Sequence, residues 1–162
     1  MSQHTTRLAP SPALKICILG GTGFVGRHIL SRLAGFHHQI TVLSRHPERK
    51  RDIGIYPGVR LIRADCHQSK VLADYIAGQD AVINLVGILN ERGDSGKEFH
   101  HVHVELAEKI GKACTKYGVH RLLHMGALHA DSGFGRSHYL LTKGEAEEIV
   151  HLAASEQLLV TS

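Results

Sequence analysis

Cysteines are few in this sequence, and long hydrophobic runs are missing. The three cysteines, Cys17, Cys66 and Cys114, are odd in number and share no metal-ligand spacing. A disulfide framework is therefore not expected, and buried reduced thiols in a cytosol-like compartment are. The longest apolar stretch, residues 81–89, is broken twice and is far shorter than the roughly 20 residues that a membrane helix needs. The sequence thus excludes a small disulfide-rich protein and a membrane-spanning one.

The composition is that of one ordinary globular domain. The chain has 162 residues, of which 43% are hydrophobic and 21% are charged. Residues 1–12 are polar, contain Pro10 and Pro12 and have no apolar centre, so we expect a loose leader and not a secretory signal. Residues 13–162 are expected to form the folded domain. With neither a signal nor a membrane helix, the sequence predicts a cytoplasmic location.

Positive charge is in slight excess, with a formal net charge of +4. The basic residues are scattered except in residues 45–51, which read RHPERKR. A local anion site explains this cluster more economically than a nucleic-acid face, and no nucleic-acid partner is expected. The 14 histidines include neighbours such as His37 and His38, but no carboxylate or cysteine falls at ligand spacing beside these pairs. No metal site is predicted.

Short apolar runs alternate with segments of helical periodicity. Runs of strand length lie at residues 13–19, 39–43, 59–63, 80–86 and 121–125, and a sixth begins at residue 157. Helical spacing is found at residues 24–33, 71–76, 102–114 and 138–154. Unbroken apolar strands alternating with helices indicate an α/β fold, a Rossmann-type doubly wound parallel sheet. Because such sheets bind ligands beyond their strand tips, we expect a substrate-binding part C-terminal to these residues.

A glycine-rich turn follows the first predicted strand. Residues 20–26 read GGTGFVG and open directly into a helix. Gly20 would permit the tight turn, Gly23 would let backbone approach a pyrophosphate, and Gly26 would let the helix pack close to the strand. In this strand-turn-helix context the motif predicts dinucleotide binding rather than an ordinary turn. The candidate cofactor-binding residues here are Gly20, Thr22, Gly23, Phe24, Val25 and Gly26.

The end of the second predicted strand carries an arginine where an NAD site usually carries a carboxylate. Ser44 and Arg45 lie about 20 residues after Gly26, at the position that reads the adenosine ribose. A guanidinium pairs with a 2′-phosphate, so NADP(H) is favoured over NAD(H), although NAD(H) stays open. The alternative is a surface arginine that falls there by chance.

Two further strand tips supply candidates for the cofactor site. Asp65, after the third strand, would accept a hydrogen bond from the adenine amino group, or would equally well cap the next helix. After the fourth strand, the backbone of Leu85, Val86 and Gly87 would line the nicotinamide ribose.

Tyr139 and Lys143 stand four residues apart in a predicted helix and so share one face. A neighbouring ammonium would favour the phenolate and prepare Tyr139 to exchange a proton with a carbonyl that gains or loses hydride. We therefore predict Tyr139 as the acid/base, with Lys143 tuning it and binding the nicotinamide ribose. The helix follows the fifth strand, which would place it beside the nicotinamide.

These motifs resemble the short-chain dehydrogenase/reductase superfamily in its extended and atypical branches, over nearly the whole chain from residue 13. The segments 41–45, 118–125 and 139–147 are similar to bacterial relatives of the NADPH-binding accessory subunit of respiratory complex I, often labelled NAD-dependent epimerase/dehydratase. The resemblance implies an NADP(H)-dependent oxidoreductase or a nucleoside-sugar epimerase/dehydratase-like enzyme acting on a small molecule. Fold similarity alone does not settle the reaction.

One residue departs from the superfamily pattern. Where a serine or threonine commonly holds the substrate oxygen at the tip of the fifth strand, this chain has Gly126. Loss of such a donor would weaken transition-state stabilisation, unless Ser132 or Ser137 substitutes for it. The alternative reading is a non-catalytic NADPH-holding module, structural or regulatory, peripherally associated with a respiratory membrane complex. A sensor of the NADP(H) ratio is a third reading, and the sequence specifies neither the substrate nor the oligomeric state.

Overall fold

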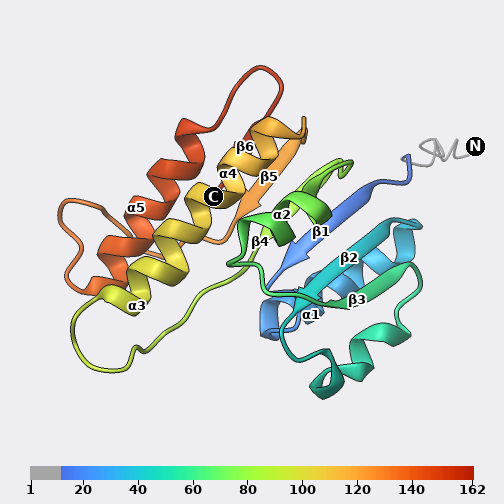
Figure 1. The fold of residues 1–162 in the computed structure, drawn as a ribbon, viewed down its shortest axis with the longest axis horizontal. Coiled ribbons are helices and arrows are strands. Elements are labelled where there is room, and N and C mark those ends of the chain that lie inside the picture. Colours follow the sequence, from blue (N-terminus) through green and yellow to red (C-terminus); the bar gives the residue numbers. More distant parts are fainter. Residues whose placement is uncertain (1–11) are drawn as a thin grey trace, which may run out of the picture.

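A computed structural model describes residues 12–162, so the predicted leader falls almost wholly outside the described residues. Six strands form one parallel sheet in the order β3-β2-β1-β4-β5-β6 (Figure 1). The predicted doubly wound Rossmann-type sheet is thereby confirmed. The strands are β1 Lys15–Leu19, β2 Gln39–Ser44, β3 Val59–Arg63, β4 Ala81–Asn84, β5 Arg121–His124 and β6 Leu159–Thr161.

Helices connect the strands as the periodicity predicts. The α-helices are α1 Phe24–Leu33, α2 Ser69–Ile76, α3 Lys97–His100, α4 Leu106–Lys116 and α5 His138–Leu152. Three short 3-10 helices are η1 Ala34–Phe36, η2 Pro47–Arg49 and η3 Arg51–Ile55. Between α3 and α4 lies η4, His101–Glu105, a π-helical turn that joins the two into one rod. This rod begins five residues before the predicted helix because Glu91 caps it, accepting hydrogen bonds from the Gly96 and Glu98 amides.

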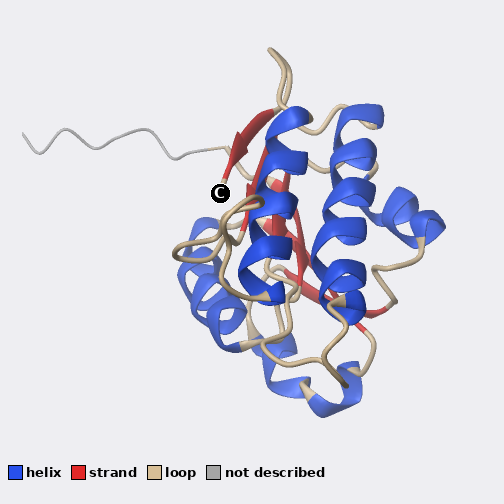
Figure 2. Ribbon diagram, turned by 90° about the vertical axis from the view of Figure 1, so that its left-hand side faces the viewer, coloured by secondary structure: helices blue, strands red, loops and turns tan. Residues whose placement is uncertain are grey.

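The core lies on both faces of the sheet. On one face, buried side chains of α2, α4 and α5 pack against residues such as Cys17, Val82 and Leu122. On the other face, Leu30 of α1 and Ile53 of η3 pack against β1, β2 and β4. Figure 2 shows the helical layers on either side of the strands. The strands are apolar on both sides because both sides are covered, which is what the unbroken apolar runs predict.

The fourth strand is shorter than its apolar run. The side-chain oxygen of Asn84 accepts a hydrogen bond from the Val86 amide at 3.1 Å. This local bond turns the chain out of the sheet, so the predicted strand 80–86 is ordered as a strand only at Ala81–Asn84. The Leu85 amide still donates to the Leu19 carbonyl at 2.9 Å, and residues 85–87 form the strand tip that borders the turn after β1.

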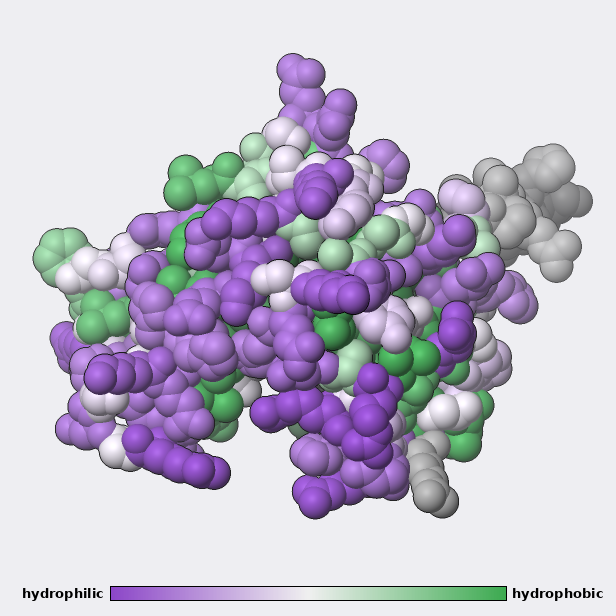
Figure 3. Space-filling model, in the orientation of Figure 1, coloured by the Kyte–Doolittle hydropathy of each residue, from purple (hydrophilic) through white to green (hydrophobic). Residues whose placement is uncertain are grey.

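The surface is largely hydrophilic in the view of Figure 3, with separate apolar patches. Phe134 and Leu128, in the loop before α5, are 90% and 85% exposed. On β6, Leu159 is 55% exposed, whereas Val160 on the opposite side is buried. Within residues 12–162, the helices are all too short or too polar to span a membrane.

Candidate dinucleotide site

The turn after β1 depends on a glycine pressed against β4. Gly20 has φ +74°, and a Cβ on it would lie 2.8 to 2.9 Å from the backbone of Leu85 and Val86. Any side chain would therefore meet both a strained φ and rigid backbone. This contact brings the first turn and the β4 tip together, directly above the centre of the sheet where the strand order reverses. Open α/β sheets bind dinucleotides at that switch point.

Gly26, in the first turn of α1, lets the helix approach the preceding turn. A Cβ on it would lie 2.5 Å from the Cα and the carbonyl carbon of Gly21. We predict that Gly26→Ala lowers the free energy of unfolding by about 2–3 kcal/mol, because backbone cannot yield as a side chain can. Urea denaturation measures this change. Gly35→Ala is the matched control, since its Cβ would have no neighbour within 4 Å, and equal stability of the two variants would contradict the prediction.

The start of α1 is built to bind an anion. Gly23 caps the helix without a side-chain hydrogen bond, and the first turn contains no acidic residue. The side chains of Phe24 and Val25 point largely to solvent, at 80% and 41% exposure, and leave the backbone uncovered. Free amides and the positive end of the helix dipole favour a phosphate at this place.

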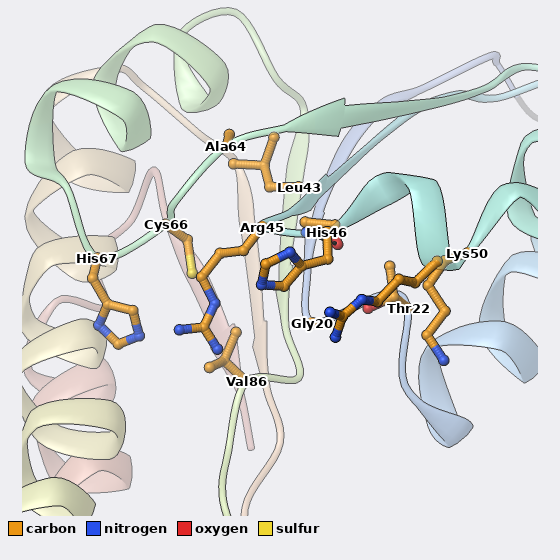
Figure 4. A pocket seen from close by; sticks show the side chains of 12 residues that line it. Gly20, Thr22, Leu43, Arg45, His46, Lys50, Ala64, Cys66, His67 and Val86 are labelled. Atoms are coloured by element: carbon orange, nitrogen blue, oxygen red, sulfur yellow. Dashed lines mark hydrogen bonds between the residues drawn. The ribbon is translucent and has the colours of Figure 1, made fainter.

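A cavity of about 300 Å³ lies beside this helix start, over the tips of β1, β2 and β3 (Figure 4). Five residues predicted from the sequence line it together: Gly20, Thr22, Ser44, Arg45 and Val86. The remaining lining residues are Leu43, His46, Arg49, Lys50, Ala64, Cys66 and His67. The cavity thus joins the glycine-rich turn to the end of β2, where the sequence predicts the adenosine ribose.

The polar wall of the cavity is cationic. Arg45, Arg49 and Lys50 line it. In Figure 4, His46 lies between Arg45 and Lys50. Glu48, the one acid in this basic run, turns away to Arg63 at 2.7 Å. None of the cavity's lining residues in the described chain is acidic. The basic cluster thus faces a cavity, and anion binding there stays a prediction.

The loop that carries Arg45 is held from the neighbouring strand. Arg63 of β3 donates one hydrogen bond to the Arg45 carbonyl at 3.2 Å and pairs with Glu48 through its other nitrogen. His46 donates its amide proton to the Ser44 hydroxyl at 3.2 Å. These contacts fix the backbone of the loop, while the Arg45 side chain is exposed and lines the cavity.

The third strand tip contributes residues that the sequence analysis did not select. Cys66 and His67 line the cavity, whereas Asp65 lines an adjoining cavity with Arg45 and Arg63. Asp65 accepts a hydrogen bond from the His67 amide, which forms a local turn. Burial, and then the Asp65 charge, raise the pKa of Cys66 to about 11, so it stays a thiol. Asp65, Cys66 and His67 each have a side-chain atom of a kind that can bind a metal ion, and these atoms lie within 4.8 Å of one another.

The tips of β4 and β5 enclose a group of buried polar side chains. Asn84 and His124 are 2% and 5% exposed, and their side-chain nitrogens Nδ2 and Nδ1 lie 3.1 Å apart. Because the Asn84 oxygen is taken by the Val86 amide, Asn84 donates and His124 Nδ1 accepts. Burial, reinforced by the Lys143 charge, lowers the pKa of His124 to about 3, so its ring is neutral. With Nδ1 accepting, the ring hydrogen of His124 is on Nε2, which is buried and has no hydrogen-bond partner among the described residues.

Tyr139 and Lys143 lie one turn apart on α5, as predicted. Tyr139 is half-buried and lines a second cavity with Leu89 and Phe99. Lys143 is only 3% exposed, and its Nζ donates a hydrogen bond to the Met125 carbonyl. Burial lowers the pKa of Lys143, and the Glu147 carboxylate partly opposes this shift. In this structure the ammonium thus holds the β5 tip, and its predicted contact with a ribose stays a prediction.

The carboxylate of Glu147 lies against Gly126, where a side chain at this position would be. A Cβ on Gly126 would overlap the carboxylate of Glu147, whose Oε1 accepts a hydrogen bond from the Ala127 amide at 3.2 Å. The space that a serine side chain at position 126 would need is therefore filled by a carboxylate from α5, the helix that also carries Tyr139. Of the two serines suggested as substitutes, Ser132 bonds to Glu148, whereas Ser137 caps α5 and lines the same cavity as Tyr139.

A serine at position 126 should be costly only while Glu147 is present. We predict that Gly126→Ser lowers the free energy of unfolding by about 1 kcal/mol, because Glu147 must leave and the Ala127 amide loses its acceptor. In a Glu147→Ala background the same serine should cost less, since the obstacle is gone. Urea denaturation of the two single variants and the double variant measures this coupling. Strictly additive costs would show that the two positions do not interact.

The structure brings the predicted cofactor residues together at one edge of the sheet, in two groups. Gly20, Thr22, Ser44 and Arg45 line the cavity beside the start of α1, while Gly87, Tyr139 and Lys143 lie toward the tips of β4 and β5. The sequence analysis missed His67, His103, His124 and Glu147. No sequence signal marked these four residues. The other lining residues His46, Arg49 and Lys50 had one, namely the density of basic residues at 45–51.

Fold and site together define a dinucleotide-binding Rossmann domain. The model of the family described as NAD(P)H-binding matches residues 20–158, and the chain belongs to this family. Two curated relatives are the mitochondrial NADH-ubiquinone oxidoreductase 40 kDa subunit of Neurospora crassa, 29% identical over 146 residues, and the 2-alkyl-3-oxoalkanoate reductase of Stenotrophomonas maltophilia, 28% identical over 167 residues. The matches cover 88% and 91% of this chain. The resemblance to complex I subunits and to reductases of the superfamily is confirmed.

Solved structures share the fold. WbmG of Bordetella bronchiseptica, in complex with NAD, superposes with a TM-score of 0.77 at 19% identity, over 94% of this chain. The UDP-glucuronic acid 4-epimerase of Bacillus cereus, also with NAD, gives 0.77 at 16% identity, over 91% of this chain. The chain spans 54% and 55% of those two proteins, and 38% and 48% of the two curated relatives.

Proposed function

We propose that this domain binds NADP(H) in preference to NAD(H) and serves an oxidoreductase or epimerase/dehydratase-like reaction in which Tyr139 is the acid/base. The observation that carries the cofactor choice is the wall of Arg45, Arg49 and Lys50 around a cavity that no described acidic residue lines. A guanidinium forms charge-assisted hydrogen bonds to a 2′-phosphate, whereas an NAD site relies on a carboxylate that accepts from the ribose hydroxyls.

We assign the two halves of the dinucleotide to the two sides of the point where the strand order reverses. The helix start at Gly23 suits the pyrophosphate, and the cavity over β2 and β3 suits the adenosine with its 2′-phosphate. The second half then extends over the tips of β4 and β5, toward Gly87 and Tyr139. There the bound nicotinamide would supply or accept hydride, and Tyr139 would hold or move the proton of the substrate oxygen.

Calorimetry with NADPH and NADH tests the cofactor choice on the full chain. We expect NADPH to bind more tightly than NADH by at least about tenfold, which is ~1.4 kcal/mol. The difference should shrink as salt rises, because the arginines are exposed and their charges are screened. Equal affinities would overturn the assignment of Arg45 to a phosphate. Failure of both dinucleotides to bind would overturn the dinucleotide proposal itself.

A second candidate function is a non-catalytic module that holds NADPH and stabilises or regulates a partner, peripherally placed at a respiratory membrane complex. Two observations favour it: Gly126 offers no hydroxyl, and the Lys143 ammonium is engaged by the Met125 carbonyl. The similarity to the 40 kDa subunit of Neurospora crassa supports this reading as well. A panel of aldehydes and ketones, assayed by the loss of NADPH absorbance, separates the two. Turnover of any of them favours the enzyme.

A further inference from the structure

A buried histidine links the rod of α3, η4 and α4 to helix α5 and to the residues that follow β4. His103 lies in the π-helical turn η4 and is 2% exposed. Its Nε2 is 3.3 Å from the Ile88 amide, and its Nδ1 is 3.0 Å from the Thr142 hydroxyl of α5. An amide can only donate, so Nε2 accepts and the ring hydrogen is on Nδ1. Thr142 in turn donates to the His138 carbonyl at 2.7 Å, which completes the chain of hydrogen bonds.

The ring of His103 keeps this arrangement over the ordinary pH range. Burial, together with the Lys143 charge, lowers the pKa of His103 to about 4. A neutral imidazole has one donor and one acceptor, and both are used here. The π-helical turn shifts the register of the rod so that this side chain points inward, and such turns occur frequently at functional sites.

The same ring touches both parts of the site that face the second half of the dinucleotide. It packs edge-on against the Tyr139 ring, with centroids 5.6 Å apart and planes at 83°. A Cβ on Gly87 would lie 3.6 Å from its Nε2, so the backbone after β4 rests on the imidazole. Phe99 closes the other side at 5.6 Å. His103 therefore sets where the 87–88 backbone and the Tyr139 ring lie relative to each other.

We propose that His103 is a positioning residue for the nicotinamide half of the bound dinucleotide. It holds the backbone of Gly87 and Ile88 and the Tyr139 ring in one arrangement and does not itself touch the adenosine side. The inference rests on the proposed binding of a dinucleotide. It predicts that loss of the imidazole weakens contacts to one half of the ligand and leaves the other half unaffected, which a general loss of stability would not do.

Two ligands distinguish binding of the nicotinamide half from binding of the adenosine half. NADPH contains both, whereas 2′,5′-ADP contains only the adenosine half with its phosphates. For His103→Leu, calorimetry should show NADPH affinity reduced by about tenfold or more and 2′,5′-ADP affinity within about twofold of the parent. The rise in NADPH fluorescence on binding, which reports the nicotinamide ring, should shrink in the same variant. Equal losses for both ligands, or no loss for either, would overturn the proposal.

Further variants keep the test decisive if His103→Leu folds poorly. Thr142→Val removes the acceptor of the Nδ1 hydrogen while keeping the shape, and a smaller loss confined to NADPH is expected. His103→Gln can still accept from the Ile88 amide and should recover part of the affinity. His100→Leu, on the exposed side of the same rod, is the matched control and should change neither ligand. If His103→Leu, His103→Gln and Thr142→Val all bind NADPH as the parent does, the proposal is overturned.

The result also separates this inference from the cofactor proposal. If the parent prefers NADH and ADP over NADPH and 2′,5′-ADP, the assignment of Arg45 to a phosphate fails. The comparison of whole dinucleotide with adenosine half then uses NADH and ADP, and a loss confined to NADH in His103→Leu still supports the role of His103. If the parent binds no dinucleotide, both proposals fall.

Discussion

Tyr139→Phe is expected to lower the rate of NADPH oxidation with a carbonyl acceptor by roughly 100- to 10,000-fold, the usual contribution of a positioned acid/base. The variant keeps the ring that packs at 5.9 Å from Phe99 and 5.6 Å from His103, and removes only the hydroxyl. The Kd for NADPH should therefore stay within about twofold of the parent. Steady-state kinetics with the best acceptor, together with calorimetry, measure the two quantities separately.

Tyr117→Phe is the control for this experiment, because that tyrosine lies at the end of α4 beside Lys116 and away from the strand tips. It should change neither turnover nor binding. Unchanged turnover in Tyr139→Phe would remove Tyr139 from the reaction. A parent that binds NADPH tightly but oxidises it with no acceptor would favour the non-catalytic module.

Arg45→Asp is expected to reduce the ratio of NADPH affinity to NADH affinity by about a thousandfold. Loss of a charge-assisted contact, the repulsion between a new carboxylate and the 2′-phosphate, and a new acceptor for the ribose hydroxyl act in the same direction and amount to ~4 kcal/mol together. The backbone should not move, since Arg63 holds the Arg45 carbonyl and Glu48. Calorimetry with both dinucleotides gives the ratio.

The matched control is Arg60→Asp, an exposed arginine of β3 that lines no described cavity and changes the net charge by the same amount. If both variants weaken NADPH binding equally, the effect is one of overall charge and not of a contact. If Arg45→Asp leaves the affinity ratio as it is in the parent, Arg45 does not meet the 2′-phosphate.

The fold could be predicted because its signals are local. Apolar runs and helical periodicity repeat along the chain, and the segment 59–63 matches β3 in full. Errors occur at the ends of elements, where a single side chain decides. Asn84 shortens β4 by bonding to the Val86 amide, and Glu91 starts the α3 rod early by capping it. Such contacts depend on side-chain geometry that periodicity does not record.

That Gly20, Thr22, Ser44 and Arg45 line one cavity could also be predicted, for the same reason. The glycines at 20, 23 and 26 occupy a fixed spacing within one turn, and Arg45 follows at a fixed distance along one βαβ unit. The other half of the site could not, because its contacts join residues far apart in the chain. Lys143 meets Met125, Glu147 covers Gly126, and His103 meets Ile88 and Thr142.

The sequence by itself determined that this protein is a doubly wound α/β domain with a glycine-rich helix start and basic residues beside it. Those features depend only on the order and spacing of residues that are close together in the sequence. Only the tertiary structure decided that the fifth strand tip is held by a buried ammonium, that a carboxylate takes the place of the expected hydroxyl, and that a neutral histidine supports Tyr139. The first two depend on the packing of α5 against the tip of β5, and the third on the packing of η4 against α5, which brings distant residues within hydrogen-bonding distance.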